Sequence, residues 1–248
     1  MMHALETHNL TKRFGGVSAL DRLSIAIARG RITGIVGPNG SGKSTLINVL
    51  TGIIPFDAGT VALEGAKLSR IRAHEVPVYG ITRTFQEVRI FGEMPVLDNA
   101  LVVLTERNVF GALFERHGEL HARRAETALR LVGLWEKRAA LARNLSYGQR
   151  KLLEIARAIL MEPKLLLLDE PFAGLFPEMV KTIASIMKRL RSEGKTIVLI
   201  EHNMQLMREL CDDLIVMDEG KLLAEGKPER ALQRRDVREA YLGEQPPE

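Results

Sequence analysis

A glycine-rich segment near the start of the chain has the residue types of a phosphate-binding loop. It reads Gly37-Pro38-Asn39-Gly40-Ser41-Gly42-Lys43-Ser44, continues into Thr45, and fits the pattern G-x-x-x-x-G-K-S/T in full. Glycines at this spacing let backbone N–H groups surround phosphates, and a following helix adds the positive end of its dipole. Lys43 is expected to reach the β- and γ-phosphates of a nucleotide, and the Ser44 hydroxyl to ligate Mg²⁺. The alternative, a chance glycine-rich turn, conflicts with the strand and helix patterns that flank the segment.

Two acidic residues follow an apolar run in the second half of the chain. Residues 165–168 are all leucine, as expected for a strand that is covered on both faces. Asp169, at the end of this run, can hold Mg²⁺ directly or through water. Glu170 is one residue further and can act as the general base for a water that attacks the γ-phosphate. A polar strand exit is the alternative, and the phosphate loop favours the catalytic interpretation.

A third segment, Leu145-Ser146-Tyr147-Gly148-Gln149, lies shortly before the leucine run. Its serine and glutamine have the S-x-x-Q spacing of a capping box, which predicts that a helix starts here and continues over residues 149–160. The free N–H groups and the dipole of a helix start suit an anion. A plain helix cap is the alternative that this spacing leaves open.

These residues need a scaffold, and the apolar periodicity predicts one of alternating strands and helices. Strand patterns occur at residues 23–27, 31–36, 60–63, 80–84, 165–168, 196–200 and 214–217. Helical spacing occurs at residues 43–50, 98–104, 120–132, 149–160 and 178–191. Such alternation predicts an α/β fold with a mostly parallel sheet. The stretch from 87 to about 162 is predicted to be a helical lobe inserted into that sheet domain.

The composition is that of an ordinary globular domain. Hydrophobic residues make up 46% and charged residues 27% of the 248 residues, and the formal charge is +4. The basic stretch 230–238 also contains acids, which favours a solvated helix face over a surface for membranes or nucleic acid. The single cysteine, Cys211, fits a reducing cytosol. Residues 1–9 lack a signal-peptide core and no apolar run has membrane-span length, so any membrane role is expected to pass through a partner.

Together these motifs resemble the ATP-binding subunits of ABC transporters over nearly the whole chain. The resemblance implies a single ABC ATPase domain over residues 1–248, with a mostly parallel core sheet, an antiparallel β subdomain and an inserted helical subdomain. It implies a RecA-like core with the antiparallel part at 1–86 and 163–240, the helical subdomain at 87–162 and a tail at 241–248. It also implies ATP and Mg²⁺ as cofactors, and a peripheral position at the cytoplasmic face of the cell membrane.

The resemblance assigns further roles one residue at a time. Gln86 stands where the family's glutamine opens the helical lobe, and its implied role is to sense Mg²⁺ and the attacking water and to report to the membrane subunit. His202 takes the place of the switch histidine, which contacts the γ-phosphate and holds the geometry between water and Glu170. Phe14 matches the aromatic residue that stacks on adenine, with a buried core Phe as the alternative.

The 145–149 segment corresponds to the family signature that completes the ATP site of a second cassette. Ser146, Gly148 and Gln149 are therefore expected to face the γ-phosphate held by the partner's loop. Two departures stand out: Tyr147 occupies a position that is commonly Gly, which reduces backbone freedom, and Phe176 replaces the acid of a turn that crosses the dimer interface. The second departure calls Asp-mediated communication between the two sites into question, though not ATP binding.

Within the family, the likeness is strongest to the ATPase subunits of branched-chain amino-acid importers. It rests on Arg13 to Gly16, on Thr82 to Gln86 with the following 88–91, on the ending Ala240 to Glu244, and on a long helical lobe around 108–125. Urea or amide importers and the ATPase of lipopolysaccharide export remain alternatives. The resemblance implies a second cassette, expected to be different from this one with a homodimer possible, two permeases and a solute-binding protein outside the membrane.

Residues 87–94, just after Gln86, are expected to line the groove that receives a cytoplasmic helix of the permease. Val88, Ile90, Phe91 and Met94 are apolar in a segment predicted to lie at the surface, which suggests an interface, with core packing as the alternative. Non-transport cassette proteins, which act on ribosomes or DNA, usually carry two cassettes or a long coiled-coil insertion, so no nucleic-acid partner is expected. A GTPase or small-molecule kinase fails, because no N-K-x-D motif is present and the signature would be unexplained.

Overall fold

The computed structural model describes residues 2–104 and 118–242 of the chain. The first part of the lobe expected around 108–125 and residues 243–248 of the predicted tail lie outside these ranges. The chain forms two compact units. Unit 1 comprises residues 1–83, 164–170 and 190–248, and unit 2 comprises residues 84–163 and 171–189.

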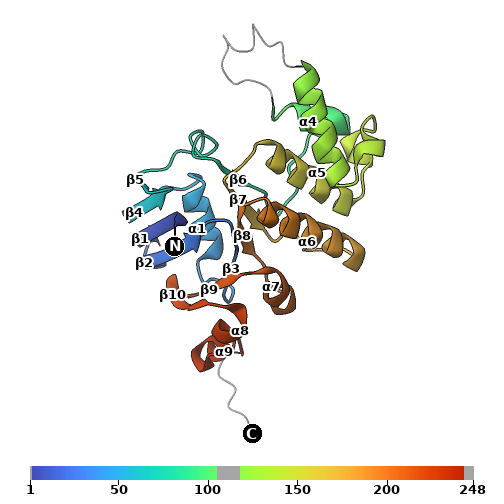
Figure 1. Cartoon of the computed structure of the whole chain (residues 1–248). Helices are drawn as coiled ribbons and strands as arrows, with labels where there is room; N and C mark the ends of the chain where they lie inside the picture. The colour runs from blue at the N-terminus through green and yellow to red at the C-terminus, as the bar shows by residue number, and fades with distance from the viewer. Residues whose placement is uncertain (1, 105–117, 243–248) are drawn as a thin grey trace. The chain divides into compact units, whose positions relative to one another are not determined.

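The main sheet of unit 1 consists of short strands, and its central strands are buried on both faces. Its order is β10-β9-β3-β8-β7-β6, and all neighbours from β9 to β6 are parallel, while β10 is antiparallel to β9. The strands are β3 (Ile32–Val36), β6 (Ile81–Arg83), β7 (Leu165–Asp169), β8 (Thr196–Ile200), β9 (Asp213–Asp218) and β10 (Lys221–Gly226). Every residue of β3, β7 and β8 is buried, as expected for the centre of a parallel sheet. The predicted mostly parallel core sheet is confirmed (Figure 1).

A second sheet in unit 1 is antiparallel and has the order β2-β1-β4-β5. Its strands are β1 (His3–Phe14), β2 (Val17–Ala28), β4 (Ala58–Leu63) and β5 (Ala66–Leu68). This sheet is the antiparallel part expected from the family resemblance. The strand β1 was not predicted, because register shifts along its pairing with β2 break the two-residue alternation that reveals strands. One face packs into the core, where Leu5, Leu10, Leu23 and Ile27 are almost fully buried.

The helices of unit 1 follow the ends of its strands. They are α1 (Lys43–Leu50), α7 (Met204–Leu210), α8 (Pro228–Ala231) and α9 (Arg235–Leu242). The bounds of α1 are those predicted, whereas α7 to α9 were not predicted. A longer helix, α6 (Pro177–Ser192), starts in unit 2 and ends in unit 1.

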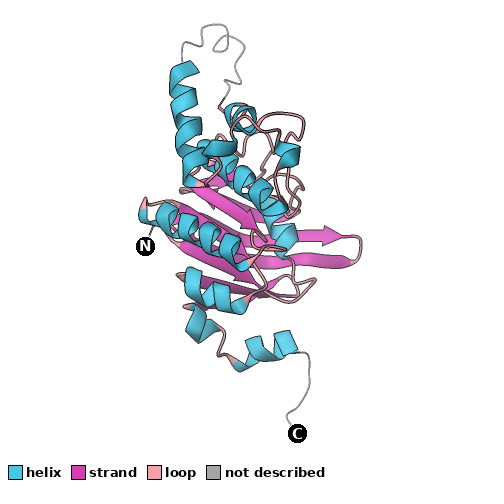
Figure 2. Ribbon diagram, turned by 90° about the vertical axis from the view of Figure 1, so that its right-hand side faces the viewer, coloured by secondary structure: helices cyan, strands magenta, loops and turns pink. Residues whose placement is uncertain are grey.

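Unit 2 is built from helices, and its described residues contain no strand. Figure 2 shows the helices of the chain in cyan and its strands in magenta. Besides most of α6 they are α2 (Val96–Leu101), α4 (Gly118–Leu131), the 3₁₀ turns Trp135–Lys137 and Ala142–Asn144, and α5 (Tyr147–Leu160). The helices α2, α4 and α5 pack on one another through buried alanines and leucines. Gly133 has φ +71° just after α4, which agrees with the stop predicted there.

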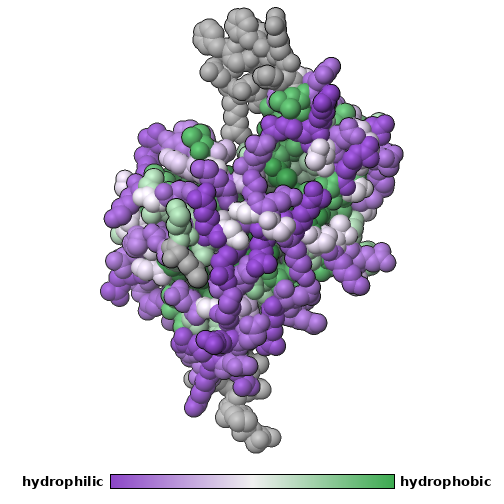
Figure 3. Space-filling view, viewed as in Figure 1, coloured by the Kyte–Doolittle hydropathy of each residue, from purple (hydrophilic) through white to green (hydrophobic). Residues whose placement is uncertain are grey.

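Hydrophilic side chains cover most of the face shown in Figure 3, and hydrophobic ones appear between them. The large hydrophobic residues that are exposed include Phe14, Val78, Phe91, Tyr147 and Phe176. Several of these belong to segments that the sequence singled out for binding. Within the described ranges, no helix combines the length and the apolar character needed to cross a bilayer.

Candidate nucleotide site

The loop between β3 and α1 can form only with glycine at two of its positions. Gly37 has φ +156°, and a Cβ there would stand 2.1 Å from the carbonyl oxygen of Met217. Gly42 has φ +98°, and its Cβ would stand 2.4 Å from the carbonyl oxygen of Ala19. Real Cβ atoms do not come so close to backbone, so Gly37 and Gly42 are required by the fold itself.

The N-terminus of α1 can bind an anion. Its N-cap is Gly42, no side chain caps the helix, and no acid lies in its first turn, so the first N–H groups are available. The ammonium group of Lys43 bends back and donates to the carbonyl oxygens of Gly37 (2.8 Å) and Pro38 (2.9 Å). Burial lowers the pKa of Lys43, and the carboxylates of Glu170 and Asp169 oppose this shift. A cation held by neutral carbonyls at a helix start fits the phosphates of a nucleotide.

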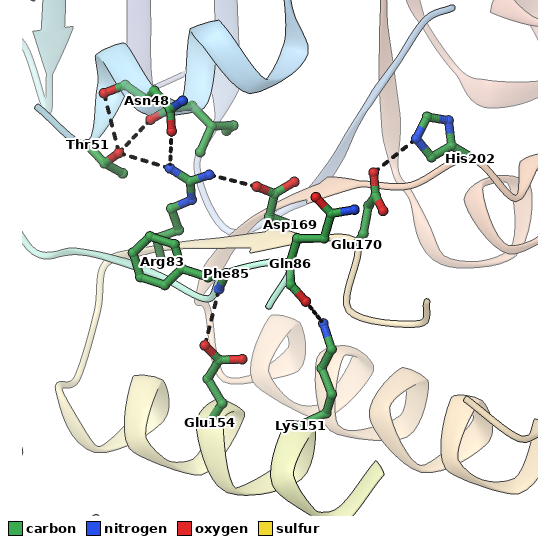
Figure 4. A network of polar contacts seen from close by, with 11 residues as sticks. Asn48, Thr51, Arg83, Phe85, Gln86, Lys151, Glu154, Asp169, Glu170 and His202 are labelled. Carbon is green, nitrogen blue, oxygen red and sulfur yellow. Dashed lines mark hydrogen bonds and ion pairs between the residues drawn. The ribbon is translucent and has the colours of Figure 1, made fainter. Parts of the chain in front are cut away.

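Asp169, at the end of β7, is paired with a residue that the sequence analysis did not select. Arg83 ends the neighbouring strand β6, and its Nη2 donates to Asp169 Oδ2 at 2.7 Å. Its Nη1 donates to Asn48 Oδ1 on α1 at 2.6 Å (Figure 4). The side chains of Arg83 and Asp169 are only 9% and 10% exposed, so the guanidinium balances a buried carboxylate. The pair ties the acidic strand to the helix that follows the phosphate loop.

Glu170 stands in a strained position directly after β7. Its φ of +47° lies in the left-handed region, which costs free energy for any residue with a Cβ. The backbone is held by a bond from Glu170 N to Ile200 O (3.0 Å), and the ring of His202 donates from Nε2 to Glu170 Oε1 at 3.0 Å. Figure 4 shows the two side chains facing one another. The backbone conformation of Glu170 and the hydrogen bond from His202 together fix the direction of the carboxylate.

Part of the phosphate loop, Glu170 and His202 line one pocket in unit 1, whereas Asp169 is not among its lining residues. Its lining consists of Ala19, Asn39, Gly40, Gly42, Lys43, Ser44, Thr45, Glu170, Ile200 and His202. The phosphate loop, the predicted base and the predicted switch histidine therefore meet, although they are far apart in the chain. The Ser44 hydroxyl and the Asp169 carboxylate supply hard oxygen donors, the kind that Mg²⁺ binds. Phe14 does not line this pocket, but its side chain is 50% exposed, so it is not a core residue, and its adenine contact stays a prediction.

The predicted signature residues Ser146, Gly148 and Gln149 lie at the start of α5 in unit 2. The capping box is confirmed: Gln149 N donates to Ser146 Oγ (3.3 Å) and Ser146 N donates to Gln149 Oε1 (3.2 Å). Tyr147 is the first residue of the helix and has no positive φ, so a side chain replaces the usual glycine there without backbone strain. Its ring is 41% exposed.

Gln86 also belongs to unit 2, in the segment between β6 and α2. Gln86 is exposed, and its backbone carbonyl oxygen accepts a hydrogen bond from Lys151 Nζ at 2.8 Å. A pocket of unit 2 is lined by Gln86, Glu87, Tyr147, Ala173 and Gly174. Phe176, two residues after Gly174, is 82% exposed. An aromatic residue therefore faces solvent at this departure from the family pattern.

Comparison with known proteins decides the family. The sequence profile of the ABC transporter family matches residues 20–173, more than half of the chain. The chain belongs to the ABC transporter family. It is an ATP-binding cassette, and its activity is ATP hydrolysis.

Individual relatives cover almost the whole chain. The high-affinity branched-chain amino acid transport ATP-binding protein BraF of Pseudomonas aeruginosa is 38% identical over 249 residues, which is 97% of this chain and 98% of that protein. A solved ATP-binding cassette of an ABC transporter in its ADP conformation has a TM-score of 0.86 and 37% identity, covering 98% of this chain and 100% of that chain. A dimeric cassette in a post-hydrolysis state, bound to ADP and Pi, has a TM-score of 0.78 and 26% identity, covering 90% of this chain and 98% of that chain.

The motif residues are predictable from the sequence, whereas the residues that hold them in place were missed. Arg83 has no predicted role of its own, although a charged residue that ends a strand beside the acidic strand indicates a counter-ion. Lys151 and Glu154 are predicted only as part of an amphipathic helix, although both lie among apolar neighbours and are buried. Ionisable residues on the buried face of a predicted helix are the signal that could have identified them.

Proposed function

We propose that this chain powers the import of branched-chain amino acids through separate membrane permeases. The observation that carries the proposal is the likeness to BraF at 38% identity over 97% of this chain, since that relative is named for branched-chain amino acid transport. The segment from Thr82 to Phe91 and the Ala240–Tyr241 ending, on which the resemblance rests, support the same assignment.

The roles of the pocket residues are part of the proposal. Lys43 and the N–H groups at the start of α1 bind the phosphates of ATP, and Phe14 stacks on adenine. Mg²⁺, held by Ser44 and Asp169 with Gln86 nearby in the liganded state, neutralises phosphate charge. Glu170 accepts the proton of the attacking water, and His202 keeps the carboxylate in place through the 3.0 Å bond.

Ser146, Gly148 and Gln149 serve the ATP of a second cassette. Ser146, the N-cap of their helix, is exposed, as an anion contact in another subunit requires, whereas Gly148 is buried and Gln149 is half-buried. A different cassette is the expected partner and an identical one the alternative. Val88, Ile90, Phe91 and Met94 support a permease contact, because none of them is buried and Phe91 is 49% exposed. Through the permeases the chain sits peripherally at the cytoplasmic face of the cell membrane, and a solute-binding protein completes the complex.

Uptake by cells tests the proposed solute. The gene for this chain is deleted in its own cell, and uptake of radiolabelled leucine, isoleucine and valine is compared with uptake of urea and a short amide. Loss of branched-chain uptake alone is expected, because the ATPase drives the permeases for those solutes. Expression of the chain should restore uptake, and expression of Glu170→Gln should not.

Two outcomes would overturn the assignment. Unchanged leucine uptake with reduced urea or amide uptake would move the chain to the alternative importers. Unchanged uptake of every solute with accumulation of lipopolysaccharide at the inner membrane would move it to export.

A further inference from the structure

The segment from Phe85 to Phe91 has no regular secondary structure, yet side chains from two helices, most of them buried, hold its backbone. It connects β6 to α2 and contains Gln86 and part of the expected permease contact. A segment without a helix or strand must satisfy its N–H and C=O groups in some other way. In this chain three residues of α5 and one of α2 supply the partners.

Glu154 is the centre of this arrangement. Its Oε1 accepts bonds from Phe85 N (3.2 Å) and from Arg89 N (3.4 Å). One carboxylate oxygen therefore closes a short turn of the segment, and the first of these bonds is drawn in Figure 4. Glu154 is 6% exposed, and its burial raises the pKa of the carboxyl, while the two backbone bonds oppose the shift.

Lys151 and Arg157 hold the carbonyl oxygens of the same turn. Lys151 Nζ donates to Gln86 O at 2.8 Å, and Arg157 Nη1 donates to Arg89 O at 2.5 Å. Lys151, Glu154 and Arg157 are spaced by three residues and so share one side of α5. Their charges alternate in sign, so each cation also lies beside the buried carboxylate and compensates it.

Asn99 fixes the end of the segment. Its side-chain oxygen accepts from Phe91 N, and its side-chain nitrogen donates to Phe91 O, both at 2.9 Å. Asn99 is fully buried in α2. The segment is thus held at Phe85 to Arg89 by α5 and at Phe91 by α2. Of its residues, Gln86, Glu87, Arg89 and Phe91 are exposed.

We propose that Glu154, with Lys151 and Arg157, acts as a positioning group that makes the 85–89 turn move with α5. The signature residues Ser146 and Gly148 start the same helix, so a shift of α5 on ATP capture carries Gln86 and the side chains around Phe91 along with it. The link to the permease rests on the proposed function, whereas the link between α5 and the turn rests on the contacts alone. Glu154 touches no reacting atom and acts through the backbone.

Amide hydrogen exchange in the intact chain tests the link. Glu154→Met removes the acceptor and keeps an apolar side chain of similar length, and exchange at Phe85 and Arg89 is expected to rise about tenfold. Glu154→Gln keeps the accepting oxygen and should raise exchange by less than about threefold. Glu126→Met on the exposed face of α4 is the matched control and should leave both amides unchanged.

Amides within α5 and α4 report on folding. A rise confined to the 85–91 segment supports the positioning role, and unchanged exchange at Phe85 and Arg89 in a folded Glu154→Met overturns it. If Glu154→Met does not fold, the Glu154→Gln variant decides by itself: exchange equal to that of a fully exposed turn would contradict the proposal.

The separate effects on kcat and KM for ATP hydrolysis give a second measurement. With Glu154→Met, kcat for ATP hydrolysis is expected to fall about tenfold while KM for ATP stays unchanged, because the turn carries Gln86 and the phosphate loop is untouched. In the assembled transporter, the solute moved per ATP hydrolysed should fall as well. Failure of the import assay with a preserved exchange effect would reject the proposed solute and keep the positioning role.

Discussion

The two functional regions of this chain are built in opposite ways. In unit 1 the phosphate loop is shaped by backbone: glycines such as Gly37 stand where no Cβ fits, and the acids follow fully buried strands. In unit 2 the Gln86 segment is shaped by side chains, since Lys151, Glu154 and Asn99 reach in from two helices to hold its backbone.

The difference teaches why one region is a recognisable motif and the other is not. A loop that depends on its own glycines must keep them in a fixed order along the sequence. A turn that is held by distant side chains leaves only scattered charged residues in the helices that hold it. The four predictions below run from the largest expected effect to the smallest.

The largest effect concerns the chemistry of unit 1. Glu170→Gln should lower the rate of ATP hydrolysis by about 10²- to 10⁴-fold, because the general base is lost while the shape is kept. ATP binding should persist and an ATP-bound dimer should accumulate, measured by nucleotide titration and size-exclusion chromatography. Glu225→Gln on β10 is the matched control and should hydrolyse ATP normally. Rapid turnover by Glu170→Gln would remove Glu170 from the role of base.

The next effect concerns the support of the acidic strand. Arg83→Met should lower the free energy of unfolding by about 3 kcal/mol, because it leaves the buried Asp169 carboxylate without its partner. Urea titration measures the change. Arg235→Met breaks the exposed pair with Glu239 and should have no measurable effect. Equal effects of the two variants would mean that the Arg83 pair contributes no more than a surface pair.

A smaller effect on stability is expected at the start of α5. Ser146→Ala removes the cap and should lower the free energy of unfolding by about 1 kcal/mol. Affinity for ATP should stay normal in the isolated chain while hydrolysis fails, because the serine serves a second cassette. Ser185→Ala on the exposed side of α6 is the control. A large loss of ATP affinity in the Ser146→Ala monomer would show that the signature serves its own site.

The effect that is smallest at neutral pH lies in the core of unit 1 and appears only in alkaline solution. Burial raises the pKa of Cys211 from 9.0 to about 12, with smaller contributions from Asp212 and Asp213. The folded protein therefore holds this proton more tightly than the unfolded chain. The stability that this provides is complete below pH 9 and is lost as the pH rises toward 12.

Cys211→Ala should lose less stability than the native protein as the pH rises. Unfolding by urea is compared at about pH 7 and about pH 11, and the native protein should lose up to about 1.4 kcal/mol per pH unit more than the variant. Iodoacetamide should label Cys211 slowly in the folded protein and fast in urea. Fast labelling of the folded protein would contradict the burial of the thiol.

The sequence predicted most of the fold where the pattern is local. The bounds of α1 and β8 agree with their apolar periodicity, and the capping box at Ser146 was found from its spacing. The strands β1, β5 and β10 and the helices α7 to α9 were missed. Register shifts interrupt the alternation in β1 and β10, β5 has three residues, and α7 and α8 have seven and four. Tertiary packing, not periodicity, stabilises such elements.

The sequence by itself determined the nucleotide chemistry, since a phosphate loop and an acidic strand end act through residues that are neighbours in the chain. Only the tertiary structure decided what supports them. Arg83 meets Asp169 across 86 positions, and Glu154 meets the backbone of Phe85 across 69. The physical reason is the range of the contact: spacing along the chain specifies a loop or a cap, but the pairing of buried charges depends on which strands and helices come to lie together.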